Sequence, residues 1–407
     1  MATKTWRGGA AAVAQVTTIT YSAYTSGQTY TITCNQKSLS FTATASTLAN
    51  VIDGLVALLE AATDAEWVEV SAVNSSGLVL TAVTAGKPFT ITSTATGAIT
   101  ATVTETTAAT GPNHFDEGAN WEGGTAPVAA DDLVFADSSY SVMYGIVDTG
   151  NNYGDITVDS TFTGEIGLPA DNPGGYREYR PRFLKLGDGS GAFAVTIGQG
   201  QGGQSSRILI DANAGTVTGA IYNTGNGLSN DIAVVIKNGD SSSEYDIYGG
   251  SVHLDCDTSA SMAALRITPD NGSAAVLCDQ GVACGAVTIA GGQLEIRGSA
   301  TSITASAGAQ VTVSNSAACG TVSVSDGANV RWNSTGNIST ALFSYNRGLI
   351  TFAGNSDSKT VAAATIYSGG SILDPHGCVT WSAGVVMTST TLEEVTLNLG
   401  RGKTVSV

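Results

Sequence analysis

Residues 292–313, GQLEIRGSATSITASAGAQVTV, contain the pattern that decides the fold of this chain. A small residue and one variable residue are followed by an apolar, a polar and an apolar residue, and this arrangement returns toward the C-terminus at 309–313, 328–332, 348–352 and 370–373. The central apolar residues are separated by 17, 19, 20 and 22 positions in the series Leu294, Val311, Val330, Ile350 and Ile372.

A second apolar series lies between the members of the first, at 287–289, 302–304, 322–324, 341–343 and 365–367. Two short strands in roughly 20 residues are typical of a parallel β-helix, in which each turn is stable only when stacked on its neighbours. Glycine permits the positive φ that corners between strands require. A string of β-sandwiches would have a similar composition, but the regular spacing and the lack of hairpin turns favour a solenoid.

We therefore expect a mainly β fold, with a small N-terminal α+β domain followed by a right-handed parallel β-helix at 131–407. Earlier turns are less regular but compatible, as at 251–254 and 275–277. The variable period indicates loops of differing length and argues against a short hexapeptide helix.

Composition excludes several functions. The chain has 407 residues, 13% charged residues and a net charge of −17, whereas nucleic-acid binding needs clustered Lys and Arg. The sequence contains no run of 18 apolar residues, so no membrane span is predicted. The N-terminus lacks the apolar core of a secretory signal. The 6 cysteines and 3 histidines have no metal-ligand spacing, so no metal site or cofactor is predicted.

Residues 1–105 are expected to form the α+β module. Alternating Thr with Val, Ile or Tyr predicts its strands, and one helix begins after Ser46 or Thr47. Gly54 lies inside this helix, where glycine costs roughly 1 kcal/mol relative to alanine, and close packing on a sheet would explain it. The helix has one apolar stripe, formed by Leu48, Val51, Ile52, Leu55, Leu58 and Leu59.

Four segments of this module carry a resemblance: 27–33 (GQTYTIT), 37–43 (KSLSFTA), 78–82 (LVLTA) and 85–91 (AGKPFTI). Together they resemble small modules that recur in bacteriophage tail and virion structural proteins. The resemblance implies that the module anchors the chain to a particle. It also implies a homo-oligomer, because such proteins are often trimers.

Residues 106–130 are expected to be a linker and an entry cap. Asn120, Trp121, Gly123, Gly124 and Pro127 precede an apolar strand at 133–135. This order resembles the entry segment of β-helical surface proteins, and the solenoid as a whole is similar to the pectin-lyase-like β-helix. We expect Trp121 to cover the first turn, because an open solenoid end needs protection.

Residues 175–183, GYREYRPRF, concentrate arginine and tyrosine in a chain that is poor in both. These residue types are enriched at the centres of protein interfaces, so a contact with an acidic neighbour or a second copy is one prediction. A glycan contact and an ordinary loop along the solenoid are the alternatives. The candidate interface residues are Tyr176, Arg177, Tyr179, Arg180 and Arg182.

Two carboxylate pairs have the i, i+2 spacing that places both side chains on one face of a strand, namely Asp255 with Asp257 and Glu244 with Asp246. Glycosidases need two carboxyls about 5–9.5 Å apart, and rungs about 4.8 Å apart would permit such a pair. Solvated acids on the outer face are the simpler explanation, so these four are weak catalytic candidates.

The sequence therefore predicts a structural, surface-exposed virion component of a bacteriophage-like particle, either a capsid decoration or a tail fibre or spike, without enzymatic activity. Expected partners are copies of itself and other virion proteins, without nucleic acid or membrane. One alternative is an adhesin that binds a host glycan through outward Tyr222, Tyr245 and Tyr248. A second alternative is a polysaccharide depolymerase on the β-helix.

Overall fold

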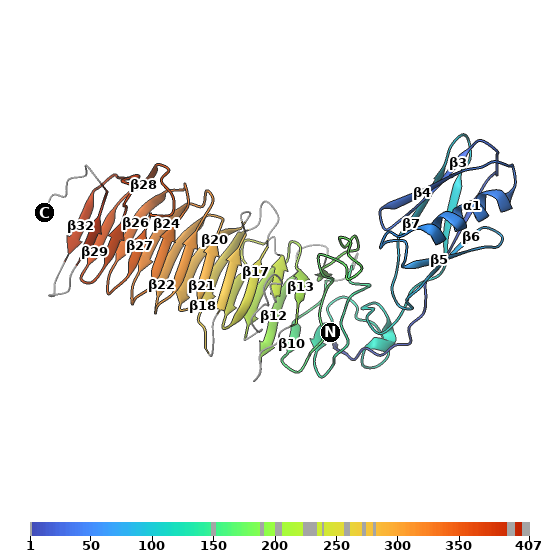
Figure 1. Ribbon diagram of the computed structural model, residues 1–407. Coiled ribbons are helices and arrows are strands. Elements are labelled where there is room, and N and C mark those ends of the chain that lie inside the picture. The colour runs from blue at the N-terminus through green and yellow to red at the C-terminus, as the bar shows by residue number, and fades with distance from the viewer. Residues whose placement is uncertain are drawn as a thin grey trace.

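The computed structural model describes residues 2–147, 152–187, 191–199, 206–222, 234–237, 240–255, 261–270, 274–279, 282–388 and 395–400. Figure 1 shows a long stack of parallel strands, with a small α+β domain beyond the N-terminal end of the stack. The predicted mainly β fold, with a parallel solenoid after a small N-terminal domain, is thus confirmed, and the solenoid has about 10 turns.

Two parallel sheets form the described part of the solenoid. The 15-stranded sheet contains β1 (Thr3–Trp6), β9 (Asp132–Phe135), β10 (Ile156–Asp159), β12 (Ala192–Gln199), β14 (Thr216–Ile221), β16 (Glu244–Ile247), β18 (Ser261–Ile267), β20 (Ala283–Ala290), β22 (Ala300–Ser306), β24 (Cys319–Val324), β26 (Ile338–Ser344), β28 (Lys359–Val361), β29 (Ala364–Tyr367), β31 (Val379–Trp381) and β32 (Val385–Thr388). The 11-stranded sheet contains β11 (Leu184–Lys185), β13 (Ile208–Asp211), β15 (Val234–Lys237), β17 (Gly250–Leu254), β19 (Ala274–Cys278), β21 (Gln293–Ile296), β23 (Gln310–Val313), β25 (Asn329–Trp332), β27 (Leu349–Thr351), β30 (Ser371–Leu373) and β33 (Thr396–Asn398).

The apolar series that predicted the solenoid forms one internal column. Leu294, Val311, Val330, Ile350 and Ile372 are register partners on successive strands. Each is at most 2% exposed, because alternate side chains of a strand point to opposite faces. The repeat seen in the sequence is therefore the rung-to-rung spacing of this sheet.

The long strands of the other sheet bend within each rung. In β20 the fully buried positions are Cys284, Val287 and Ile289, so the inward spacing changes from three residues to two. A change of period within a strand marks a corner, because strict alternation continues only along a straight strand. Strand β26 has a corner of the same kind. It pairs with β28 near its start and with β29 near its end, so two separate strands of the next rung continue the two arms of this one strand.

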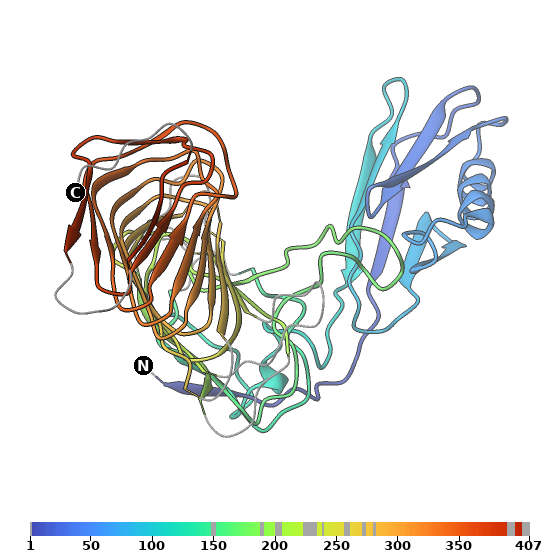
Figure 2. The same ribbon diagram turned by 60° about the vertical axis from the view of Figure 1, so that its left-hand side comes forward.

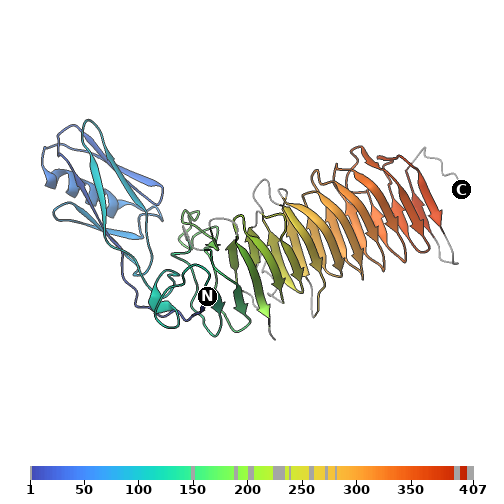
Figure 3. The same cartoon turned by 180° about the vertical axis from the view of Figure 1, so that it is seen from behind.

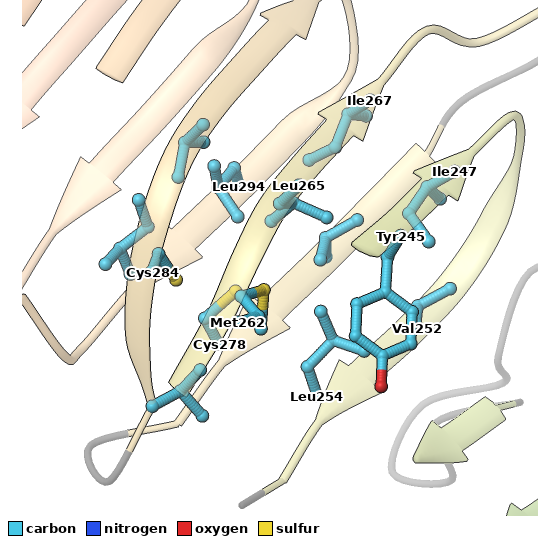
Figure 4. Packing of buried hydrophobic residues seen from close by; sticks show 14 of the residues in the cluster. Tyr245, Ile247, Val252, Leu254, Met262, Leu265, Ile267, Cys278, Cys284 and Leu294 are labelled. Carbon is cyan, nitrogen blue, oxygen red and sulfur yellow. The ribbon is translucent and has the colours of Figure 1, made fainter. Parts of the chain in front are cut away.

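Apolar side chains from both sheets fill the space between them. Figure 4 shows Tyr245, Met262, Leu265, Cys278 and Leu294 packed together in this core. Cys278 and Cys284 are both buried, and no disulfide joins the cysteines of the described residues. They act there as small hydrophobic side chains.

The N-terminal module has two antiparallel sheets and one helix. Its 4-stranded sheet has the order β5 (Val70–Asn74), β6 (Leu78–Ala82), β2 (Val16–Tyr21) and β8 (Ala101–Thr107), and its 3-stranded sheet the order β4 (Lys37–Thr42), β3 (Thr29–Cys34) and β7 (Ile91–Ala95). Helix α1 (Leu48–Ala61) begins after Thr47, whose side chain accepts a hydrogen bond from the Asn50 amide. No helix among the described residues is both long enough and apolar enough to cross a membrane.

Close packing explains the glycine in the helix. A methyl group added at Gly54 would overlap the ring of Phe41, which lies on β4. The helix therefore approaches the 3-stranded sheet more closely than a residue with a side chain allows, as the sequence suggested.

The first strand of the chain differs from the expected boundary. Residues 1–105 were expected to form the module, but β1 pairs in parallel with β9 in the solenoid sheet. The module thus lies between two adjacent solenoid strands, joined to the solenoid by two chain segments. The strand TKTW is too short to reveal its partner from its own pattern, because pairing depends on β9, more than 120 residues away.

Candidate functional site

The predicted carboxylate pair on β16 is an exposed ion-pair network. Glu244 and Asp246 point outward, and Arg266 on the next rung lies 2.9 Å from Glu244 Oε2 and 3.2 Å from Asp246 Oδ1. The three side chains are 36–47% exposed. These hydrogen bonds raise the pKa of Arg266. The pair is thus neutralised by a cation in open solvent, and Asp257, the predicted partner of Asp255, lies outside the described residues.

Asp255 belongs to a different cluster on the 11-stranded sheet. His253 on β17 has its Nε2 3.3 Å from Oδ2 of Asp279, which follows β19. One ligand atom from each of His253, Asp255 and Asp279 lies within 4.8 Å of the other two. Lys237 Nζ lies 3.8 Å from Asp255 Oδ2, and Arg297 Nη1 lies 3.8 Å from Asp279 Oδ1. The stacked rungs thus assemble side chains that are far apart in the sequence.

A groove of about 500 Å³ runs over the outer face of the same sheet beside this cluster. Its outward side chains lie in two register columns along the solenoid axis. One column holds Ser251, Ala275, Gln293 and Gln310, and the other holds Leu277, Glu295, Thr312 and Arg331. The groove offers amide, hydroxyl and charged groups at the regular spacing of the rungs.

The tyrosine row proposed for glycan binding is not formed as expected. Tyr245 is 1% exposed and packs inside the solenoid. Tyr222 and Tyr248 follow β14 and β16, and their rings stack at 4.6 Å with an interplanar angle of 10°. In β16 the side chains of Tyr245 and Ile247 point into the core. Because side chains alternate between the two faces of a strand, Tyr245 and Tyr248 are not expected on the same face.

The arginine- and tyrosine-rich segment holds the module against the solenoid. Arg180 donates to Glu178 through Nε at 2.7 Å and through Nη2 at 2.8 Å, and its Nη1 donates to the carbonyl of Pro88 in the module at 2.9 Å. The side chains of Glu178 and Arg180 are 0% and 8% exposed. The guanidinium also lies over the rings of Tyr144 and Tyr179 at 5.3 and 5.1 Å. The predicted interface is therefore occupied, at Arg180, by a contact within the chain.

The electrostatics of this joint favour the charged pair. Burial alone would raise the pKa of Glu178, but hydrogen bonds from Arg180 and Asn172 lower it below its ordinary value. Burial would lower the pKa of Arg180, but the hydrogen bonds to Glu178 raise it. Burial also raises the pKa of Tyr176, and the carboxylate of Glu69 in the module raises it further. Both partners of the ion pair are thus held ionised.

The remaining members of the predicted set lie around this pair. Tyr176 is buried and stacks on Tyr179 at 6.1 Å. Arg182 donates through Nε to the carbonyls of Leu168 and Pro169. Arg177 is exposed. Figure 2 shows the loops of the first turns reaching up beside the sheets of the module.

Trp121, the predicted end cap, packs against residues of the first rung. Its ring packs on Trp6 of β1 at 5.2 Å and on Phe135 of β9 at 5.9 Å, and it is 2% exposed. Its indole N–H donates to the carbonyl of Phe115 at 2.7 Å. Asn120, beside it, donates through Nδ2 to the carbonyls of Gly111 and His114. These contacts fix the returning chain over the end of the solenoid.

No family model, curated protein or solved structure matches this chain. The site is therefore interpreted from its own geometry. It contains a buried joint between module and solenoid, an outer groove, and a cluster of one histidine and two aspartates.

Proposed function

We propose that this protein is a structural, surface-exposed component of a bacteriophage-like particle, with the module as its attachment end and the solenoid as a rigid projecting shaft. The observation that carries the proposal is the buried contact between the two parts. Two chain segments and the Arg180–Glu178 pair connect them, and Arg180 also donates to the carbonyl of Pro88 in the module, so a force on the shaft can pass to the module through several contacts.

The solenoid has the properties of a shaft. Its apolar core is one continuous cluster from Trp6 to Val379. In both sheets, the backbone groups of each parallel strand form hydrogen bonds with the strands of the neighbouring rungs. Twelve strand-to-strand steps separate β1 from β31, which corresponds to about 60 Å at about 4.8 Å per step. Figure 3 shows the stacked strands following one another toward the C-terminal side of the solenoid.

A mechanical function also agrees with the surroundings of the candidate carboxylates on β16. Glu244 and Asp246, the candidate pair that the structure describes, are exposed to solvent and share Arg266, whereas a general acid works in a pocket that shelters it from water. The resemblance of the module to tail and virion modules supports a phage-like particle, and a homo-oligomer is the expected state.

Quantitative mass spectrometry of purified particles from cells that make this chain tests the proposal. We expect the chain to co-purify with particles at a fixed copy number, with hundreds of copies for a capsid decoration and a few for a fibre or spike. Absence from particles, with the chain recovered only as unassembled protein, would refute it. X-ray scattering of the purified chain should give a rigid elongated shape.

The outer groove favours a second candidate function, the binding of an extended glycan. Gln293 and Gln310 are register partners, and Glu295 and Arg331 flank them in the next column. Such polar groups bind sugar hydroxyls by hydrogen bonds. A glycan array should then give hits with the wild type that the double variant Gln293→Ala and Gln310→Ala loses. No hits with the wild type would eliminate this function.

A further inference from the structure

We propose that His253, Asp255 and Asp279 bind a divalent transition-metal ion, and that Zn²⁺ is the cation that fits these donors best. The three residues come from the ends of two strands on neighbouring rungs, β17 and β19, and meet on the outer face of the 11-stranded sheet. The proposal is independent of the particle proposal, because it rests only on this cluster.

The spacing of the donor atoms suits a small tetrahedral ion. Zinc bonds to nitrogen and oxygen of about 2.0–2.1 Å imply ligand atoms roughly 3.3 Å apart at tetrahedral angles. The distance from His253 Nε2 to Asp279 Oδ2 is 3.3 Å. Asp255 supplies the third donor, and all three atoms lie within 4.8 Å of one another. Water would complete the coordination.

The chemistry of the donors selects the class of ion. Imidazole nitrogen with two carboxylates suits zinc and its neighbours, whereas calcium and magnesium prefer oxygen donors alone. His253 Nε2 is shielded from solvent, and its contact with Asp279 Oδ2 at 3.3 Å does not have the geometry of a hydrogen bond. A nitrogen in this position loses its hydration without a compensating bond, and a metal ion would satisfy it.

Two cationic side chains lie beside the carboxylates of the cluster. Lys237 Nζ is 3.8 Å from Asp255 Oδ2, and Arg297 Nη1 is 3.8 Å from Asp279 Oδ1. A divalent ion would compete with these two cations for the carboxylates, whose two negative charges balance its charge. The side chains of His253, Asp255 and Asp279 are 17%, 31% and 34% exposed, so an ion can enter from solvent and still be partly sheltered.

Isothermal titration of the metal-free full chain with Zn²⁺ tests the proposal. We expect one ion per chain. His253→Ala and Asp279→Asn should each weaken binding by at least about tenfold, which is the lower end of the effect of losing even an outer-shell partner. His376→Ala is the matched control, because His376 is exposed and lies outside the cluster. Circular dichroism verifies that each variant is folded, and Asp255→Asn replaces any variant that is not.

Cobalt substitution separates this site from adventitious binding to cysteine. We expect Co²⁺ to give the absorption of a nitrogen- and oxygen-ligated ion without a thiolate charge-transfer band, and we expect millimolar Ca²⁺ or Mg²⁺ not to displace it. The proposal is overturned if the wild type shows no stoichiometric binding. It is also overturned if the folded cluster variants bind as the wild type does, or if a thiolate band appears.

Discussion

Replacing Arg180 with methionine should open the joint between module and solenoid in a pH-dependent way. The substitution keeps an unbranched apolar stem but removes the guanidinium, and it leaves the Glu178 carboxylate, 0% exposed, without its cation. Removing one partner of a buried pair costs about 3–5 kcal/mol. Glu178 can limit this cost by taking up a proton, which from an ordinary pKa of about 4.3 requires about 3.7 kcal/mol at pH 7 and about 1 kcal/mol at pH 5.

The sign of the pH dependence follows from the pKa of Glu178. In the wild type this pKa is lowered, so the contribution of the pair is complete above about pH 4.3 and is lost as the pH falls through the lowered value. In Arg180→Met the buried carboxylate has no cation, its pKa rises, and the joint weakens as the pH rises. The two proteins should therefore differ most at neutral pH.

Hydrogen exchange of the loop amides measures this opening locally. The amides of Leu168, Asn172 and Glu178 donate to carbonyls within the loop. After correction for intrinsic rates, their exchange in Arg180→Met should be faster than in the wild type by about 500-fold at pH 7 and by about fivefold at pH 5.

Two further variants test the explanation of this result. Arg177→Met is the matched control, because Arg177 is exposed and lies in the same loop, and it should leave the exchange unchanged. The double variant Arg180→Met with Glu178→Gln should recover most of the loss at pH 7. The reasoning would be refuted if the increase in exchange rate in Arg180→Met did not depend on pH. It would also be refuted if the loop amides of the double variant exchanged as fast as those of the single variant.

Three further predictions concern the core and the surface. Gly54→Ala should lower the unfolding free energy of the module by about 1–3 kcal/mol, in spite of the better helix propensity of alanine, because of overlap with Phe41; Phe41→Leu in the same chain should restore part of it in thermal unfolding followed by tryptophan fluorescence. Ile350→Ala, at a fully buried position, should cost about 2–5 kcal/mol and speed hydrogen exchange first in the adjacent rungs; uniform exchange along the chain would contradict this. Glu244→Gln with Asp246→Asn should change the unfolding free energy by at most about 1 kcal/mol in denaturant unfolding, because exposed ion pairs contribute little. A larger loss would contradict this prediction and show that the ion pairs stabilise the fold.

The candidate sites were predictable to different degrees. The segment at 175–183 could be singled out from its composition, but its contact with Pro88 joins residues 92 positions apart and has no local signal. His253 and Asp255 have a visible i, i+2 spacing that indicates a shared face. Their third partner, Asp279, is separated from them by a loop of the solenoid, and the length of such loops varies from rung to rung.

The amino-acid pattern alone determined the solenoid, the helix stripe and the inward column from Leu294 to Ile372. These features are repeated or local, so each strand carries its own period and needs only an equivalent neighbour. The tertiary structure decided that Thr3–Trp6 pairs with β9 and that the arginine-rich loop docks on the module. It also decided that three polar side chains meet on adjacent rungs. Each of these is a single contact between distant segments, and only the folded path of the chain brings such segments together.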